Sequence, residues 1–117
     1  MTQEDKELLL KDLCARLPYK IKASYYDAEE GLETWDEIEG ITLDGYVDIG
    51  QYSLPIESIK PYLFPLSSMN EKEWEDCKKN GMRNATTITD WVNTHHFDFR
   101  GLIEKGLAID ATGLNIY

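Results

Sequence analysis

Two adjacent histidines and a nearby carboxylate are the residues of this chain whose types best suit chemistry. His95, His96 and Asp98 stand close together in the sequence, and general bases and metal sites both use histidine beside a carboxylate. Neighbouring residues on a helix point about 100° apart, so the two imidazoles are poorly placed to share one metal ion. The favoured interpretation is structural, with His95 on the core side of a helix and His96 as a cation at its C-terminus. A small hydrolase or metal enzyme that uses these three residues stays open as an alternative.

The segment that follows the histidines provides one candidate binding surface, formed by His96, Asp98 and Arg100. Here we expect Asp98 and Arg100 to form an ion pair that fixes a turn between two apolar segments. The chain shows none of the motifs that mark a serine or cysteine nucleophile, a nucleotide loop or a calcium loop. Cys14 and Cys77 lie in apolar helical patterns, which indicates reduced, packed thiols. The sequence thus predicts no catalytic residue, no cofactor and no metal.

The acidic residues are distributed very unevenly. The net charge is −10, and no Lys or Arg occurs between Lys22 and Lys60. Ten acidic residues fall in that interval, and the remaining acids and bases of the chain balance one another. Such a field repels nucleic-acid phosphates and attracts a basic protein surface. The acids that we expect to capture a partner surround a predicted turn and the strand after it: Glu29, Glu30, Glu33, Asp36 and Glu37.

Other interpretations of this acidic stretch remain open. It can be a solvated face that keeps the protein soluble, or an acidic nucleic-acid mimic that occupies a basic groove on a host enzyme. We expect the partner to be a protein with a basic surface, without direct contact to nucleic acid. No apolar run approaches the roughly 18 residues of a membrane span, and no signal-peptide core is visible. The expected location is therefore the cytoplasm.

Hydrophobic periodicity predicts the elements that position these residues. A helix is expected over 2–17, capped by Thr2 with Asp5. Alternating apolar residues predict strands over 19–26 and 34–43, with a bulge at Gly40, and a third strand after the Asp44-Gly45 turn. The proline-rich segment 54–66 is expected to be irregular, because prolines at this density disfavour a central strand. Further helices are predicted near 69–79 and 87–96, the first with Asn70 or Ser68 at its cap.

Together these elements predict a single α+β domain over residues 1–117. It would have an N-terminal helix, a small three-stranded antiparallel meander within 19–50, two C-terminal helices and a short extended segment near the end of the chain. The apolar positions of these patterns also predict the core. Its expected members are Leu13, Ile21, Trp74, Trp91, Val92 and Leu102.

Two parts of the C-terminal half resemble a known family. The runs from Ile59 to Met69 and from Trp91 to Asp110, which includes His95-His96-Phe97-Asp98, are similar to short uncharacterised proteins encoded in phages and prophages of gut anaerobic bacteria. The resemblance implies a bacterial cytoplasm, a mobile element and an accessory role, and it carries over no catalytic or binding residue. The leading hypothesis is a non-enzymatic phage or prophage accessory protein that acts by binding another protein.

Overall fold

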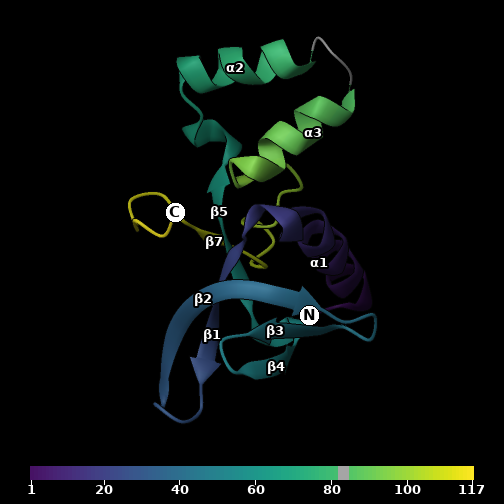
Figure 1. Cartoon of the computed structure of the whole chain (residues 1–117), viewed down its shortest axis with the longest axis vertical. Helices are drawn as coiled ribbons and strands as arrows, with labels where there is room; N and C mark the ends of the chain where they lie inside the picture. The colour runs from purple at the N-terminus through teal and green to yellow at the C-terminus, as the bar shows by residue number, and fades with distance from the viewer. Residues whose placement is uncertain (82–84) are drawn as a thin grey trace.

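A mixed β-sheet organises the molecule, and the computed structural model describes residues 1–81 and 85–117 of it (Figure 1). The described residues form seven strands, in the order β4-β3-β2-β1-β5-β6, with β7 also paired to β5. The pairs from β1 to β4 and between β1 and β5 are antiparallel, whereas β6 and β7 run parallel to β5. The strands are β1 (Lys22–Asp27), β2 (Leu32–Ile41), β3 (Tyr46–Ile49), β4 (Tyr52–Pro55), β5 (Lys60–Pro65), β6 (Phe97–Asp98) and β7 (Ile109–Asp110).

Three α-helices accompany the sheet in the described part of the chain. They are α1 (Gln3–Arg16), α2 (Glu71–Gly81) and α3 (Ala85–Thr94), and short 3-10 turns span Leu17–Tyr19, Ile56–Ser58 and Leu66–Ser68. The predicted capping box of α1 is confirmed, because Thr2 accepts a bond from the Asp5 N–H and Asp5 accepts one from the Thr2 N–H. Asn70 and Glu73 cap α2 in the same reciprocal way, at 2.8 and 3.1 Å. Both boxes satisfy backbone donors that the first helical turn leaves unpaired.

The predicted three-stranded meander is wrong, because it covers less than half of the sheet. Strands β1, β2 and β3 do form it, but β4 extends the sheet at one side and β5 at the other. Segment 60–65, expected to be irregular because of its prolines, is the strand that joins β1 to both β6 and β7. Each of these ladders has only two residue pairs. A strand with such short ladders needs few N–H donors, so it tolerates Pro61 and Pro65.

The predicted bulge in the second strand is confirmed. Ile38 pairs with Ile49 and Gly40 with Asp48, so the register of β2 against β3 shifts between Ile38 and Gly40. The shift lets Ile38 be buried while Ile41 still packs against the same core. The connection to β3 is the four-residue loop 42–45, in which Gly45 takes a left-handed conformation with φ of +88°.

The main core lies between α1 and the sheet, and a second, smaller cluster lies under α2 and α3. Leu13, Ile21 and Leu102 belong to the first, and Trp91 and Val92 to the second, as the sequence predicts. Trp74 is the exception, since 51% of its surface is exposed and the Lys78 ammonium lies over its ring.

The predicted burial is also wrong for one of the two cysteines. Cys77 is buried, as expected of a packed thiol, whereas Cys14 is exposed, and both are free. On α1 it is Leu9 that lies in the core beside Leu13. The two helices α2 and α3 stand at one end of the molecule, whereas the β1–β2 hairpin lies at the other (Figure 1). No helix in the described ranges is long and apolar enough to cross a membrane.

Candidate functional site

The hairpin formed by β1, β2 and the turn between them carries the predicted binding acids; we call residues 22–41 the acidic hairpin. Its turn is held by Asp27, whose carboxylate accepts the N–H groups of Glu29 and Glu30 at 3.0 and 3.2 Å. The Tyr52 hydroxyl donates to the same oxygen at 2.8 Å and ties the turn to β4. This Tyr52 hydrogen bond, followed by the bond from Glu30, lowers the pKa of Asp27. The acidic turn is therefore fixed in shape.

The predicted acids are accessible but do not share one face. Glu29, Glu30, Glu33 and Asp36 are exposed and Glu37 is half-exposed. Residues paired across antiparallel strands point to the same side. Glu33 and Glu37 therefore lie on the outer face, across from Tyr26 and Lys22. Asp36 lies on the opposite face of the hairpin, because it pairs with Ala23. Glu29 and Glu30 lie in the turn between β1 and β2, at the tip of the hairpin.

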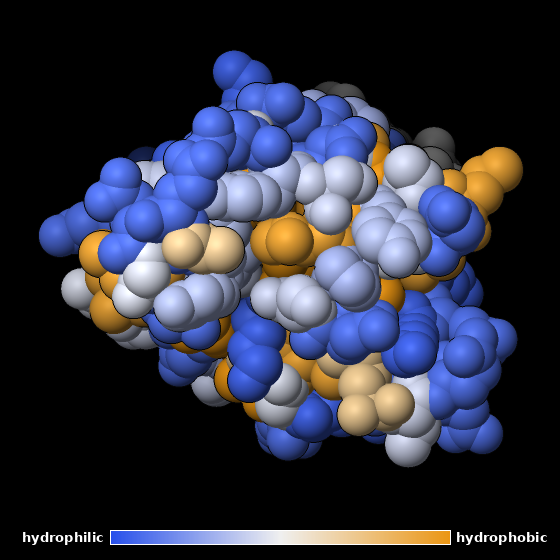
Figure 2. All heavy atoms as spheres, turned by 90° about the horizontal axis from the view of Figure 1, so that it is seen from below, coloured by the Kyte–Doolittle hydropathy of each residue, from blue (hydrophilic) through white to orange (hydrophobic). Residues whose placement is uncertain are grey.

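Exposed aromatic rings accompany the acids on the outer face. Tyr26 is 54% exposed and Trp35 is 45% exposed. The one cation of this stretch, Lys22, is already engaged: its ammonium donates to the Ile116 carbonyl at 2.8 Å and lies 5.1 Å from the centroid of the Trp35 ring. The outer face thus combines aromatic surface with carboxylates that form no ion pair with another described residue. Seen from below, where the hairpin end of the molecule faces the viewer, hydrophilic residues dominate the outline and apolar residues show near the centre (Figure 2).

His96 is not the cationic helix cap that the sequence predicts. It follows the end of α3 with a left-handed φ of +62°, and its ring stacks on Tyr117 with the centroids 3.7 Å apart. Burial, reinforced by the positive charge of Arg16, lowers the pKa of His96 to about 4. The imidazole is therefore neutral at physiological pH. Its Nδ1 is buried without a hydrogen-bond partner among the described residues.

His95 also departs from its expected place. It is exposed rather than part of the core, and its ring stacks on Trp91 at 4.1 Å. Both histidines line a cavity of about 470 Å³ between the start of α2, the end of α3 and the C-terminal segment. Asp98 does not line this cavity. The described part of the chain contains no group of three or more His, Cys, Asp or Glu side chains placed to hold a metal ion.

The expected pair of Asp98 with Arg100 is wrong as well. Asp98 is buried, and its two oxygens accept the N–H groups of Leu102 and Ile103, both at 2.9 Å. Arg100 instead donates to Asp12 of α1 at 2.7 Å. Asp98 therefore shapes the turn after β6 by capping backbone groups, and as a buried side chain it adds no exposed carboxylate to the surface predicted with His96 and Arg100.

Sequence reasoning missed a buried ionic cluster at the end of α1. Asp12 and Arg16 are both fully buried, and Arg16 Nε donates to the Asp12 carboxylate at 2.8 Å. Arg16 also donates to the Phe97 carbonyl at 2.6 Å. With Arg100 on the other carboxylate oxygen, this cluster joins α1 to the segment after α3. The helical i, i+4 spacing of Asp12 and Arg16 was a visible signal, although it is more common on exposed faces.

Comparison with family models, with curated proteins and with solved structures found no match for this chain.

Proposed function

We propose that the protein is a non-enzymatic accessory protein of a phage or prophage, which acts in the bacterial cytoplasm by binding another protein through the acidic hairpin. The observation that carries this proposal is that the hairpin carboxylates are accessible and form no ion pair among the residues that the structure describes. None of the ten acids between Lys22 and Lys60 is buried, and the hairpin's own cation, Lys22, is held against Trp35 and the Ile116 carbonyl.

The chemistry of the hairpin favours a basic protein as the partner. Tyr26 and Trp35 offer large, stiff aromatic area, which is enriched at the centres of protein interfaces. Carboxylates around them would steer a basic surface into contact and exclude acidic competitors. An arginine of the partner could stack on Trp35 and reach Glu33 or Glu37, since both acids lie on the same face as the ring.

The two alternative functions receive less support from the geometry. A nucleic-acid mimic needs its carboxylates on one face, yet Asp36 points opposite to Glu33 and Glu37. A hydrolase or metal enzyme needs His96 and Asp98 to converge, yet Asp98 caps two backbone groups outside the cavity that His96 lines.

The test is capture of partners from a bacterial lysate by three immobilised forms of the protein. The first is the parent, and the second has the hairpin acids Glu29, Glu30, Glu33, Asp36 and Glu37 changed to the matching amides. The third is a matched control in which five exposed acids elsewhere, Glu4, Glu71, Glu75, Asp90 and Glu104, become amides. Both variants change the net charge by the same amount, so a difference between them reports the place of the charges.

We expect the parent and the control to recover the same basic protein, and the hairpin variant to lose it. Recovery should also fall as salt rises, because charges on an exposed surface are screened over about 8 Å at physiological ionic strength. Circular dichroism must show that all three forms are folded. Equal recovery by the hairpin variant and the parent would leave the acids as a solubility feature and refute the proposal.

A further inference from the structure

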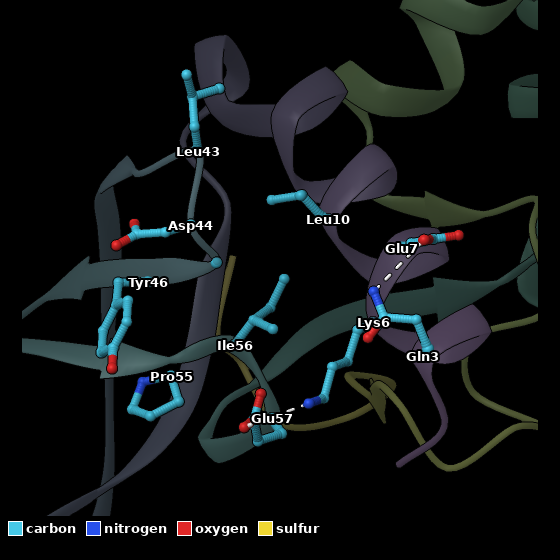
Figure 3. Close-up of a pocket in the computed structure, with 11 residues that line it drawn as sticks. Gln3, Lys6, Glu7, Leu10, Leu43, Asp44, Tyr46, Pro55, Ile56 and Glu57 are labelled. Carbon is cyan, nitrogen blue, oxygen red and sulfur yellow. Dashed lines mark hydrogen bonds and ion pairs between the residues drawn. The ribbon is translucent and has the colours of Figure 1, made fainter.

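A groove of about 370 Å³ lies at the opposite end of β2 from the acidic turn, between α1, the loop 42–45 and the end of β4. Its floor is apolar, since the side chains of Leu10 and Ile56 extend into the same space (Figure 3). Leu43 stands fully exposed at its edge, and Tyr46, which is 42% exposed, forms a wall. A volume of this size is at the lower end of the roughly 300–1,000 Å³ typical of ligand pockets.

The rim of the groove is acidic on two opposite sides. Glu7 lies on α1 and Asp44 on the loop across from it (Figure 3). A third carboxylate, on Glu57, is compensated by the Lys6 ammonium at 3.7 Å. Glu7 accepts one hydrogen bond from the Gln3 amide and Asp44 one from the Thr42 hydroxyl. Those two contacts orient the carboxylates of Glu7 and Asp44, and neither carboxylate forms an ion pair with a cation among the described residues.

We propose that this groove binds a short peptide segment of a partner protein, in which one apolar side chain is flanked on both sides by Lys or Arg. The apolar side chain would pack on Leu10 and Ile56, and the cations would reach Glu7 and Asp44. Charge complementarity selects this occupant, because an acidic segment would be repelled and a purely apolar one would leave both carboxylates without a counter-charge.

The groove is a second surface, independent of the proposed function of the acidic hairpin. The strand β2 joins the two sites and has ten residues, so at about 3.3 Å per residue they lie up to roughly 30 Å apart. One partner could contact both surfaces, yet each can be tested alone.

The test is chemical-shift mapping of the isotope-labelled protein with three synthetic peptides. The first has one phenylalanine between two arginines in an otherwise alanine sequence. The second replaces the phenylalanine by alanine, and the third replaces the arginines by glutamates. We expect saturable shifts of the amides of Leu10, Leu43, Gly45 and Ile56 with the first peptide, and none of comparable size with the other two.

A pair of isosteric variants separates the groove from general charge effects. Glu7→Gln with Asp44→Asn should weaken binding of the first peptide about tenfold, because two exposed ion pairs are lost. The matched control, Glu4→Gln with Glu104→Gln, has the same net charge and should bind as the parent does.

Three results would overturn the proposal. Equal shifts with the arginine-alanine peptide would mean that charge alone is recognised. Shifts confined to Glu29–Glu37 would assign the peptide to the acidic hairpin instead. If the chemical shifts of the groove amides changed with protein concentration in the absence of peptide, a second copy of the chain would be the occupant of the groove.

Discussion

Arg16 joins α1 to the segment after α3 from a fully buried position. Its guanidinium donates to Asp12 and to the Phe97 carbonyl. We expect Arg16→Met to lower the free energy of unfolding by about 3–5 kcal/mol, because Asp12 stays buried with only Arg100 as its counter-charge. Urea denaturation measures the change. The exposed neighbour Lys11 supplies the control, since Lys11→Met should differ from the parent by less than about 0.5 kcal/mol. Equal losses in the two variants would contradict a structural role of the cluster.

The neutral state of His96 makes stability depend on pH. Its pKa falls from 6.5 to about 4 on folding, so between these values the unfolded chain binds the proton better and stability drops as pH falls. We expect a loss of about 1 kcal/mol from pH 7 to pH 5, after allowance for screening of a side chain that is only partly buried.

Thermal melts at the two pH values measure this loss in the parent and in His96→Asn, which tolerates the left-handed backbone. Asp27 and Asp110 have pKa values lowered from 3.8, so their contribution falls outside the window. The variant should lose less stability than the parent between pH 7 and pH 5. An equal loss would show that other groups cause the dependence.

At the scale of single residues, the sequence predicted which polar side chains make specific contacts better than it predicted the partners in those contacts. His96, Asp98 and Arg100 are all engaged in specific contacts, but the partner of Arg100 is Asp12, 88 positions away. Sequence proximity favoured the local pair of Asp98 with Arg100. Only the packing of α1 against the segment after α3 brings the Asp12 carboxylate close to Arg100, and no local pattern encodes that packing.

Among the elements, the turn between β3 and β4 depends on a glycine. Gly50 has φ of +59°, and a Cβ added there would come within 2.5 Å of the Tyr25 hydroxyl. Gly113 also has a positive φ, of +77°, but a Cβ there would meet nothing within 4 Å. The conformation alone costs about 1 kcal/mol, and we expect the clash to raise the cost of Gly50→Ala to about 2–4 kcal/mol.

Denaturation of Gly50→Ala and Gly113→Ala separates the clash from the backbone strain. Combining Gly50→Ala with Tyr25→Phe, which removes the hydroxyl, should recover part of the loss in a double-mutant cycle. Equal costs for the two glycine variants would mean that Tyr25 moves aside freely, despite being buried against Tyr52.

The elements themselves were mostly predictable, and their assembly was not. Capping boxes and periodicity located α1, α2 and α3 to within a few residues, and the conflict between Ile38 and Ile41 located the bulge of β2. The strand β5 was not predicted, because prolines disfavour strands with long ladders, whereas the ladders of β5 are short. Trp74 was assigned to the core because it stands three residues before Cys77 in the predicted helix, so that the two share one face. The buried residues of α2 and α3 instead form their own small cluster, which leaves Trp74 outside.

On the scale of the whole molecule, negative charge is concentrated at one end. The acidic hairpin lies opposite α2 and α3 (Figure 1), and it carries most of the acids that make up the net charge of −10. The unfolded chain separates these charges, whereas folding holds them close, so their mutual repulsion opposes folding. A surface of this kind lowers stability, which fits the proposed role in binding better than a role in packing.

That repulsion predicts a specific dependence of stability on salt. The screening length falls from about 30 Å at 0.01 M salt to about 8 Å at 0.15 M, so the melting temperature of the parent should rise over this range. About 1 kcal/mol of relieved repulsion would correspond to a rise of roughly 4 °C for a domain of this size.

The variant with the five hairpin acids changed to amides should melt higher than the parent at low salt and respond less to added salt. The control with five amides elsewhere should keep more of the parent's response, because Glu4, Glu71 and Glu75 lie on helices that also carry bases and Glu104 is followed by Lys105. Identical salt responses of the two variants would mean that the hairpin carboxylates are too far apart to repel one another, and would weaken the argument that they act together on a partner.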